Sequence, residues 1–196
     1  QLGQIDSVGG IVSPGLIASF VLLGLFPLAA RYGVALARRR RARAGYTRPK
    51  HFDRNLIVIG AGSAGLVAAL IAATVKARVT LIEKNAMGGD CLNTGCVPSK
   101  ALLRTARAAH DMRRADRFGL TPVEPSFDFR DVMTRVKDII ATIAPHDSVE
   151  RYQSLGVDVR TDSARLLDPW TVELGDGTRL SARAIAATSR ADHSWA

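Results

Sequence analysis

The chain has 196 residues, enough for one domain of ordinary size with an appendage, and 47% of them are hydrophobic. The formal net charge of +9 is concentrated at residues 31–54, which hold nine basic side chains and one acidic side chain. Residues 55–196 are nearly neutral, so the high charge does not indicate a nucleic-acid-binding domain, and we expect no nucleic-acid partner. Two cysteines, Cys91 and Cys96, are too few for the disulfide framework of a small secreted protein.

An uncharged apolar run occupies residues 11–30 and is about long enough to cross a bilayer as a helix. Arg31 and the basic run 38–43 follow it directly, and basic residues at one end of an apolar segment mark its cytoplasmic side. We therefore expect residues 1–44 to form a transmembrane helix, kinked near its end by Pro27, with a basic juxtamembrane segment that contacts membrane lipid.

Three other interpretations of this segment stay open. A signal peptide would carry its basic residues before the apolar run, a buried core helix would be shorter, and a nucleic-acid-binding patch would have more interleaved aromatic side chains than Tyr46 alone.

Residues 45–53 are polar and contain a proline, which indicates a linker. We expect a soluble domain at residues 54–189 and an irregular tail at residues 190–196.

The start of the soluble domain has the order of a dinucleotide-binding unit. Residues 55–59 are apolar and rich in β-branched side chains, as is typical of a buried parallel strand. They lead into a G-x-G-x-x-G motif at residues 60–65, an alanine-rich helical stretch at 66–76 and a second strand at 78–82. This order predicts a Rossmann-like βαβ unit, although it does not separate FAD from NAD.

Each glycine of the motif has a physical role. Gly60 allows the tight turn from strand to helix, Gly62 lets the backbone approach a pyrophosphate, and Gly65 permits close packing of the helix on the strand. The amides at the helix N-terminus attract phosphate. Glu83 ends the second strand, where its carboxylate can accept hydrogen bonds from ribose hydroxyls.

Cys91 and Cys96 lie in a glycine-rich segment that leads into a helical stretch at residues 100–114. A thiol near a helix N-terminus has a lowered pKa, and the thiolate is the form that attacks a disulfide or binds a soft metal ion. A zinc site would need two more ligands, and the four histidines are scattered. A purely structural disulfide is not typical of a cytosolic domain. The spacing therefore favours a redox-active pair.

Residues 88–100 read GGDCLNTGCVPSK and resemble the active-site segment of the class I pyridine nucleotide-disulfide oxidoreductases. This family includes dihydrolipoamide dehydrogenase, glutathione reductase and mercuric reductase. The resemblance extends over roughly residues 55–180 and is most specific at residues 60–100. Family members usually have threonine where this chain has Asp90, and the aspartate resembles a subgroup of mercuric-reductase-like bacterial proteins.

The resemblance implies an FAD site and a role for each matching residue. It implies that Cys91 is the interchange thiol facing the substrate, Cys96 the charge-transfer thiol against the flavin, and Lys100 a charge near the flavin N5. The residues that it implies in FAD binding extend from the pyrophosphate loop to the ribose, the flavin side and the adenine, and are Gly60, Gly62, Ser63, Ala64, Gly65, Glu83, Lys84, Gly89, Asp90, Cys91 and Ala164.

The remainder of the domain predicts helices and a small β-meander. Residues 127–154 have apolar side chains at helical spacing, with a break expected at Pro145; His146 and Glu150 are interpreted as a solvated pair. Asp176-Gly177 is a hairpin signal. Short strands are predicted at residues 156–160, 164–167, 171–174 and 179–187. The expected fold class is α/β, with a parallel sheet and a β-meander after a transmembrane helix.

The resemblance implies an FAD-dependent NAD(P)H:disulfide or metal-ion oxidoreductase that is a homodimer in its complete form. Its nicotinamide-binding and dimerisation domains are expected outside this sequence, so we expect the chain alone to be inactive. The segment around residues 13–31 resembles the link between a DedA-like, SNARE-associated membrane domain and a fused mercuric-reductase-like enzyme, which implies the bacterial inner membrane. Two alternatives stay open: a non-catalytic membrane-anchored remnant, and a regulatory flavin module of a membrane transport protein. Ser189 stands where the family has the glycine of Ala-Thr-Gly.

Overall fold

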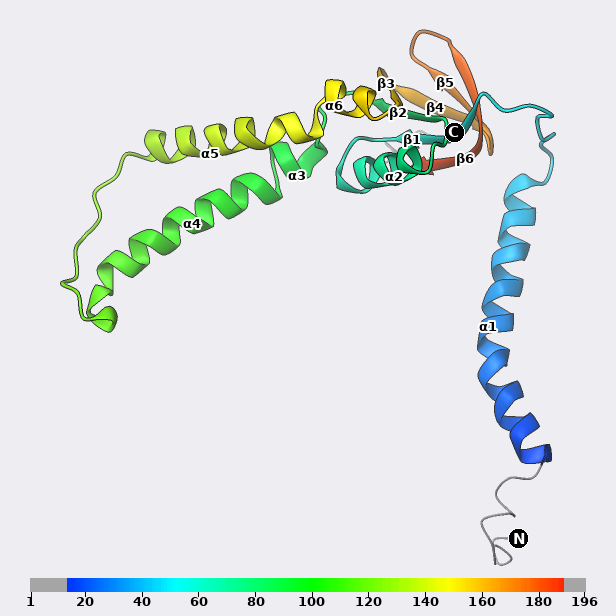
Figure 1. Cartoon of the computed structure of the whole chain (residues 1–196), viewed down its shortest axis with the longest axis horizontal. Helices are drawn as coiled ribbons and strands as arrows, with labels where there is room; N and C mark the ends of the chain where they lie inside the picture. Colours follow the sequence, from blue (N-terminus) through cyan, green and yellow to red (C-terminus); the bar gives the residue numbers. More distant parts are fainter. Residues whose placement is uncertain (1–13, 189–196) are drawn as a thin grey trace, which may run out of the picture. The chain divides into compact units, whose positions relative to one another are not determined.

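The computed structural model describes residues 14–188 and divides the chain into two compact units, Gln1–Thr47 and Arg48–Ala196. The first unit contains one long helix, and the second is an α/β domain (Figure 1). The predicted tail at residues 190–196 and the departure at Ser189 lie outside the described residues.

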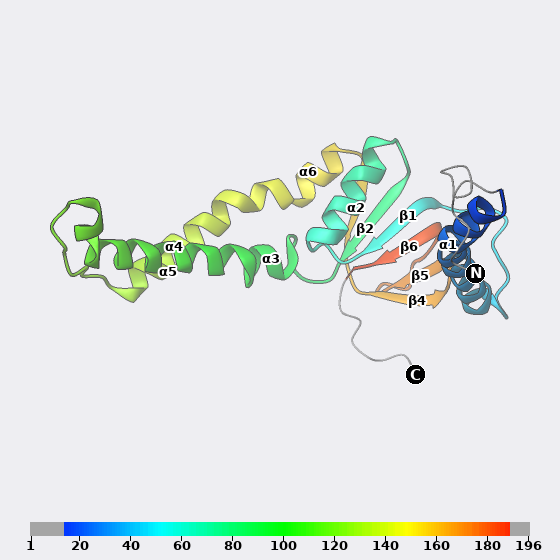
Figure 2. The same ribbon diagram turned by 90° about the horizontal axis from the view of Figure 1, so that it is seen from below.

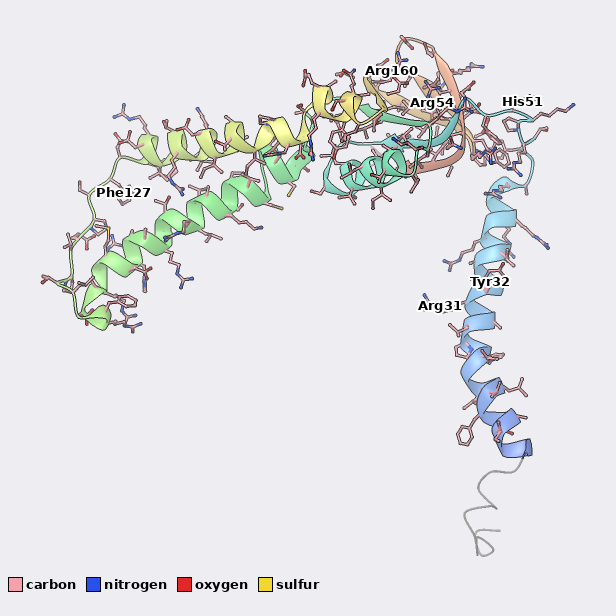
Figure 3. All side chains as sticks on the ribbon, in the orientation of Figure 1. Arg31, Tyr32, His51, Arg54, Phe127 and Arg160 are labelled. Carbon is pink, nitrogen blue, oxygen red and sulfur yellow. The ribbon has the colours of Figure 1, made fainter. Side chains whose placement is uncertain are left out.

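Helix α1 (Pro14–Arg43) makes up the described part of the first unit. Residues Ile17–Arg38 are long and apolar enough to cross a membrane, by length and composition alone. The helix runs through Pro27 and includes the basic residues predicted to follow it, because alanine and arginine are both strong helix formers. Figure 3 shows Arg31 and Tyr32 on this helix, and both side chains are exposed.

The second unit is built on three parallel strands, β1 (Arg54–Ile59), β2 (Val79–Glu83) and β3 (Val157–Thr161). β1 pairs with β2 and β2 with β3, with Leu56 opposite Val79. The central residues of β1 and β2 are buried on both faces of the sheet, and all of them are apolar except Thr80.

The second half of the sheet is the predicted meander, β4 (Ala164–Asp168), β5 (Thr171–Leu174) and β6 (Arg179–Ala187). β6 pairs parallel to β1 and antiparallel to β5, giving the order β3-β2-β1-β6-β5-β4. Asp176 accepts a hydrogen bond from the Thr178 amide at 2.7 Å, which closes the expected hairpin turn. The α/β prediction is confirmed, and the predicted strands agree with the observed ones to within one residue at each end.

Alternation along the strands sends side chains to two separate cores. On one face, Val58 and Leu81 pack with helix α2 (Ser63–Thr74) and with Tyr152 of α6 (Val149–Ser154). On the other face, a second cluster joins β1 and β2 to the meander; its buried members are Ile57, Ile82, Val172, Leu174 and Ala182. Figure 2 shows α2 beside the sheet. The two cores fix the end of β1, where the glycine motif begins.

Helices α3 (Gly89–Asn93), α4 (Cys96–Arg113) and α5 (Phe129–Ile143) form a helical extension of the same unit (Figures 1 and 2). Arg135 on α5 donates to the Ala101 carbonyl on α4 at 3.1 Å. A short 3-10 turn separates α5 from α6, so the break predicted at Pro145 is confirmed.

His146 lies in that turn and Glu150 in α6, and both side chains are exposed. Because the two residues belong to different helical elements, they do not share one helical face.

A polar network holds the first three strands together at the edge where β1 begins. Arg54 donates to Asp158 at 2.9 Å and to Thr80 at 2.7 Å, and Arg160 donates to Asp158 at 2.9 Å. Figure 3 labels both arginines. Burial opposes the charge of Asp158, but these hydrogen bonds outweigh it and lower the pKa of its carboxyl group.

We expect Asp158→Ala to lower the free energy of unfolding by about 1–3 kcal/mol, because Arg54 and Thr80 lose their shared acceptor. Urea denaturation at pH 7 measures the difference. A folded-state pKa below the ordinary value means that this stabilisation is complete above about pH 4 and is lost as the pH falls through the lowered pKa. The gap between wild type and variant should therefore close in strongly acidic solution. Asp138→Ala, at an exposed position on α5, is the matched control; an equal loss in both variants would contradict the role of the network.

Candidate functional site

The glycine motif forms the turn between β1 and α2. Gly60 has a φ of +101°, a conformation that side chains disfavour, and its amide donates to the Ile82 carbonyl at 2.8 Å. A Cβ on Gly65 would lie 1.8 Å from the Gly60 carbonyl oxygen. The close packing of helix on strand that the sequence predicted for Gly65 is therefore present.

The N-terminus of α2 offers an open cradle of backbone groups. Gly62 precedes the helix, no side chain caps it, and a Cβ at Gly62 would meet no atom within 4 Å. Ser63 and Ala64, the first two helical residues, are exposed. The first amides of a helix have no partner inside the helix and favour an anion. The predicted phosphate-binding residues are thus brought together at one open helix end.

Glu83 supports this turn from the end of β2. Its carboxylate accepts hydrogen bonds from the Ala61 amide at 2.6 Å and from the Asn85 amide at 2.9 Å. Each carboxylate oxygen can accept a further bond, so the side chain combines a structural role with capacity for a ribose hydroxyl. Lys84 beside it is exposed.

Ala164 begins β4, directly after the turn in which the Asp162 amide donates to the Glu83 carbonyl at 3.0 Å. Its side chain packs against the second core cluster, which contains Ile57 and Val172, so the backbone is the part of Ala164 that is available to an adenine. The binding roles of Glu83, Lys84 and Ala164 stay predictions.

The cysteine segment lies directly against the phosphate loop. The Gly88 amide donates to the Ala61 carbonyl at 2.9 Å. A Cβ on Gly89 would lie 2.8 Å from the Gly62 Cα, so only glycine permits this approach. Asp90 follows in the first turn of α3, and its carbonyl accepts a bond from the Gly95 amide at 2.6 Å. The two motifs that the sequence predicted separately form one continuous structure.

Asn93 and Thr188 also shape the site, and the sequence analysis missed both. The Asn93 amide group donates to the carbonyls of Met87 at 3.1 Å and Gly89 at 2.9 Å, which fixes the loop before the cysteines. The Thr188 hydroxyl lies 3.1 Å from the Ile59 carbonyl and 3.0 Å from the Gly60 carbonyl. Asn93 lies inside the cysteine motif, so the sequence could have indicated its role. The contact of Thr188 depends on the pairing of β6 with β1, which no local sequence pattern predicts.

Cys91 lies in α3 and is half-buried, and Cys96 is the first residue of α4 and is exposed; both are free thiols. A hydrogen bond from the Cys96 thiol lowers the pKa of Cys91, with further contributions from the Ser63 hydroxyl and the charge of Lys100. The same bond and the charge of a Cys91 thiolate raise the pKa of Cys96. Cys91 is therefore the thiol that ionises first.

Lys100 lies four residues after Cys96 on α4 and is exposed. Its positive charge lowers the pKa of both cysteines. Its predicted place near a flavin N5 stays a prediction. Within residues 14–188, no three histidine, cysteine or acidic side chains form a group that could hold a metal ion.

Residues 54–188 match the family model of the pyridine nucleotide-disulphide oxidoreductases. The chain belongs to this family. The family is flavin- and pyridine-nucleotide-dependent, and the matched range contains the glycine motif, both cysteines and the meander. The oxidoreductase prediction is therefore confirmed at the level of the family.

Curated relatives of this chain include dihydrolipoyl dehydrogenases. The protein of Zymomonas mobilis is 42% identical over 113 residues, which cover 54% of this chain and 24% of the relative. Dihydrolipoyl dehydrogenase 2, chloroplastic, of Arabidopsis thaliana is 34% identical over 142 residues, covering 71% of this chain and 25% of the relative. The chain thus spans about a quarter of the length of these relatives.

A solved structure of similar fold is the Cu(II) complex of HOCl-induced flavoprotein disulfide reductase RclA from Escherichia coli. Its TM-score is 0.54 at 21% sequence identity, and the match covers 68% of this chain and 27% of that chain. At this identity the likeness supports the fold alone. The resemblance to mercuric-reductase-like proteins and to a DedA-like fusion stays a prediction.

Proposed function

We propose that residues 54–188 form the FAD-binding, dithiol-bearing part of an NAD(P)H:disulfide oxidoreductase. The observation that carries this proposal is the direct contact between the phosphate loop and the cysteine segment, through Gly88 with Ala61 and Gly89 with Gly62. A dinucleotide held at that loop would have its phosphates beside the segment that carries the redox pair.

The residues present fit a dinucleotide. The open α2 N-terminus would hold the pyrophosphate with the amides of Ser63 to Gly65, and Glu83 would accept from the ribose. The lack of a Cβ at Gly65 and Gly89 is what brings strand, helix and cysteine segment this close. FAD, when bound, would supply a pair of electrons to the Cys91–Cys96 disulfide, and NAD(P)H would be the donor in the complete enzyme.

The dithiol would then reduce the substrate by thiol–disulfide exchange. The Cys91 thiolate attacks one sulfur of a substrate disulfide, forming a mixed disulfide and releasing one substrate thiolate. The Cys96 thiolate next attacks the Cys91 sulfur, which closes the internal disulfide and releases the second substrate thiolate. The lowered pKa of Cys91 suits the first step, because the group that ionises first is the better attacker at neutral pH. A soft metal ion is the alternative substrate, and the complete enzyme is proposed to be a homodimer.

The proposed FAD site predicts that Gly62→Ala lowers the affinity for FAD without changing the stability of the fold. A Cβ there meets no protein atom within 4 Å, so Gly62→Ala should fold with the stability of the wild type. The added methyl group would occupy the space that a pyrophosphate needs, and the affinity for FAD should fall at least about tenfold. Quenching of FAD fluorescence on titration with the purified chain measures the affinity. Equal affinity in the two proteins, or no quenching by the wild type, would contradict the proposal.

Helix α1 is proposed to anchor the chain in the bacterial inner membrane, with the α/β domain in the cytoplasm. The exposed side chains Phe20 and Leu23 suit a lipid environment, and the last turn carries Arg40, Arg41 and Arg43, which suit anionic headgroups. Flotation with phosphatidylglycerol-containing vesicles tests the anchor: the whole chain should float with the vesicles, and a chain without residues 1–47 should stay at the bottom. The DedA-like upstream domain is part of this proposal and is tested by the gene sequence before Gln1.

A further inference from the structure

The helix that carries Cys91 is little more than a single turn. Helix α3 has five residues, Gly89–Asn93, and lies between the sheet and the long helix α4 (Figure 2). A helix of this length is not stable by itself in water, so contacts with the rest of the domain must hold it. The buried side chain of Leu92 provides one such contact. The N-cap residue is Gly88, which has no side chain to cap the helix.

The Asn93 side chain ties the end of this helix back to its start. Its amide nitrogen donates to the Gly89 carbonyl at 2.9 Å and to the Met87 carbonyl at 3.1 Å. The amide group has two hydrogens, which matches these two backbone acceptors. Gly89 is the first residue of α3 and Met87 precedes its N-cap, so the last residue of the helix holds the backbone on both sides of its beginning.

The turn that follows α3 brings the two cysteines together. Asp90 comes directly before Cys91, and its carbonyl accepts a hydrogen bond from the Gly95 amide at 2.6 Å. Gly95 in turn comes directly before Cys96. A Cβ on Gly95 would lie 3.8 Å from the Cys91 Cα. The backbone that leads into Cys96 therefore passes beside Cys91, and the approach of the two thiols depends on α3 keeping its place.

We propose that Asn93 is a positioning residue of the dithiol: its side-chain amide holds α3 in place, so that Cys91 stays within reach of Cys96 and the disulfide between them closes readily. This inference rests on the proposed function and names a residue that acts on the proposed redox pair through Cys91. A turn that is already held by hydrogen bonds loses less conformational entropy when the two sulfurs join. The effective concentration of one thiol at the other is therefore higher.

The tendency of the pair to close is measured as an equilibrium constant. The reduced, flavin-free whole chain in detergent is equilibrated with mixtures of reduced and oxidised glutathione at pH 7. One thiolate of the pair attacks glutathione disulfide and releases one glutathione thiolate, and the other then attacks the mixed disulfide and releases the second. The chain loses two electrons and two protons, and glutathione disulfide becomes two molecules of glutathione. Alkylation followed by mass spectrometry counts the thiols that remain free.

Two variants remove the hydrogen bonds of Asn93, and a third is the matched control. Asn93→Ala deletes the amide group. Asn93→Asp keeps the shape of the side chain, but its carboxylate has no hydrogen to donate. Thr94→Val removes the hydroxyl of the next residue, whose hydrogen bond of 3.4 Å goes to the Asp90 carbonyl, and leaves the two bonds of Asn93 in place.

Both Asn93 variants should lower the equilibrium constant for disulfide closure about five- to thirtyfold, because two hydrogen bonds to backbone carbonyls are lost. Thr94→Val should stay within about twofold of the wild type, since the bond that it removes is long and weak. A wild-type constant in a folded Asn93 variant would overturn the proposal, as would an equal fall in Thr94→Val. Circular dichroism shows which variants are folded, and Asn93→Asp decides the outcome if Asn93→Ala is not.

This test does not depend on the cofactor. A wild-type chain that does not quench FAD fluorescence, with the expected fall in the Asn93 variants, would refute the flavin proposal alone. A chain that binds FAD and closes its disulfide, with unchanged constants in the variants, would refute only the role of Asn93. A wild-type chain that forms no internal disulfide would refute the dithiol of the proposed function and the role of Asn93 with it.

Discussion

Gly65→Ala is expected to lower the free energy of unfolding of the α/β domain by at least about 3 kcal/mol, or to prevent its folding. A methyl group at this position would lie 1.8 Å from the Gly60 carbonyl oxygen and 2.8 Å from the Thr188 hydroxyl. The first of these atoms is backbone and cannot rotate away, so α2 has to move off β1 and the packing of Leu66 and Ala69 in the core is disturbed.

Urea denaturation followed by the fluorescence of the buried Trp170 measures this loss. Gly62→Ala is the matched control, since it adds the same methyl group three residues earlier in open space. A Gly65→Ala protein with the wild-type unfolding midpoint would contradict the close packing at this turn.

The two thiols of the reduced chain are expected to differ in reactivity. Cys91 has a lowered pKa and Cys96 a raised one, so at pH 7 iodoacetamide should modify Cys91 about tenfold faster than Cys96. The ratio should narrow as the pH rises above both pKa values, where each thiol is fully ionised. Mass spectrometry of the peptide that contains both residues measures the two rates. The same chain unfolded in urea is the control, because the folded environment is lost and the rates should become similar.

The same pair should close on mild oxidation into a disulfide within one chain. The wild type should lose both free thiols without forming a covalent dimer, whereas Cys91→Ser and Cys96→Ser each retain one thiol. Equal alkylation rates in the folded chain, or oxidation only between chains, would contradict the proposed dithiol.

Local patterns predicted most of the sheet. The β-branched runs of β1 and β2 are buried on both faces, and the Asp176-Gly177 signal does form a turn, because each depends on neighbours in the sequence. The glycine motif was informative for the same reason: Gly60 and Gly65 answer local steric demands, the φ of +101° at Gly60 and the 1.8 Å approach at Gly65.

Contacts between distant segments were less predictable. The hydroxyl of Thr188 reaches the Gly60 carbonyl only because β6 inserts beside β1, and no local pattern reports that pairing. The cysteine spacing predicted a redox pair but not that the Gly88 amide would bind the Ala61 carbonyl. Helix α1 continues past the apolar run into the basic segment, because helix propensity rather than hydrophobicity sets where it ends.

The absorption spectrum of the purified chain, reconstituted with FAD and freed of unbound cofactor, tests the central claim most directly. The account predicts flavin bands at close to one FAD per chain and, on addition of two electrons, a broad band at longer wavelength that Cys96→Ser removes. A spectrum without flavin, or a long-wavelength band that persists unchanged in Cys96→Ser, would contradict a flavin site joined to the Cys91–Cys96 pair.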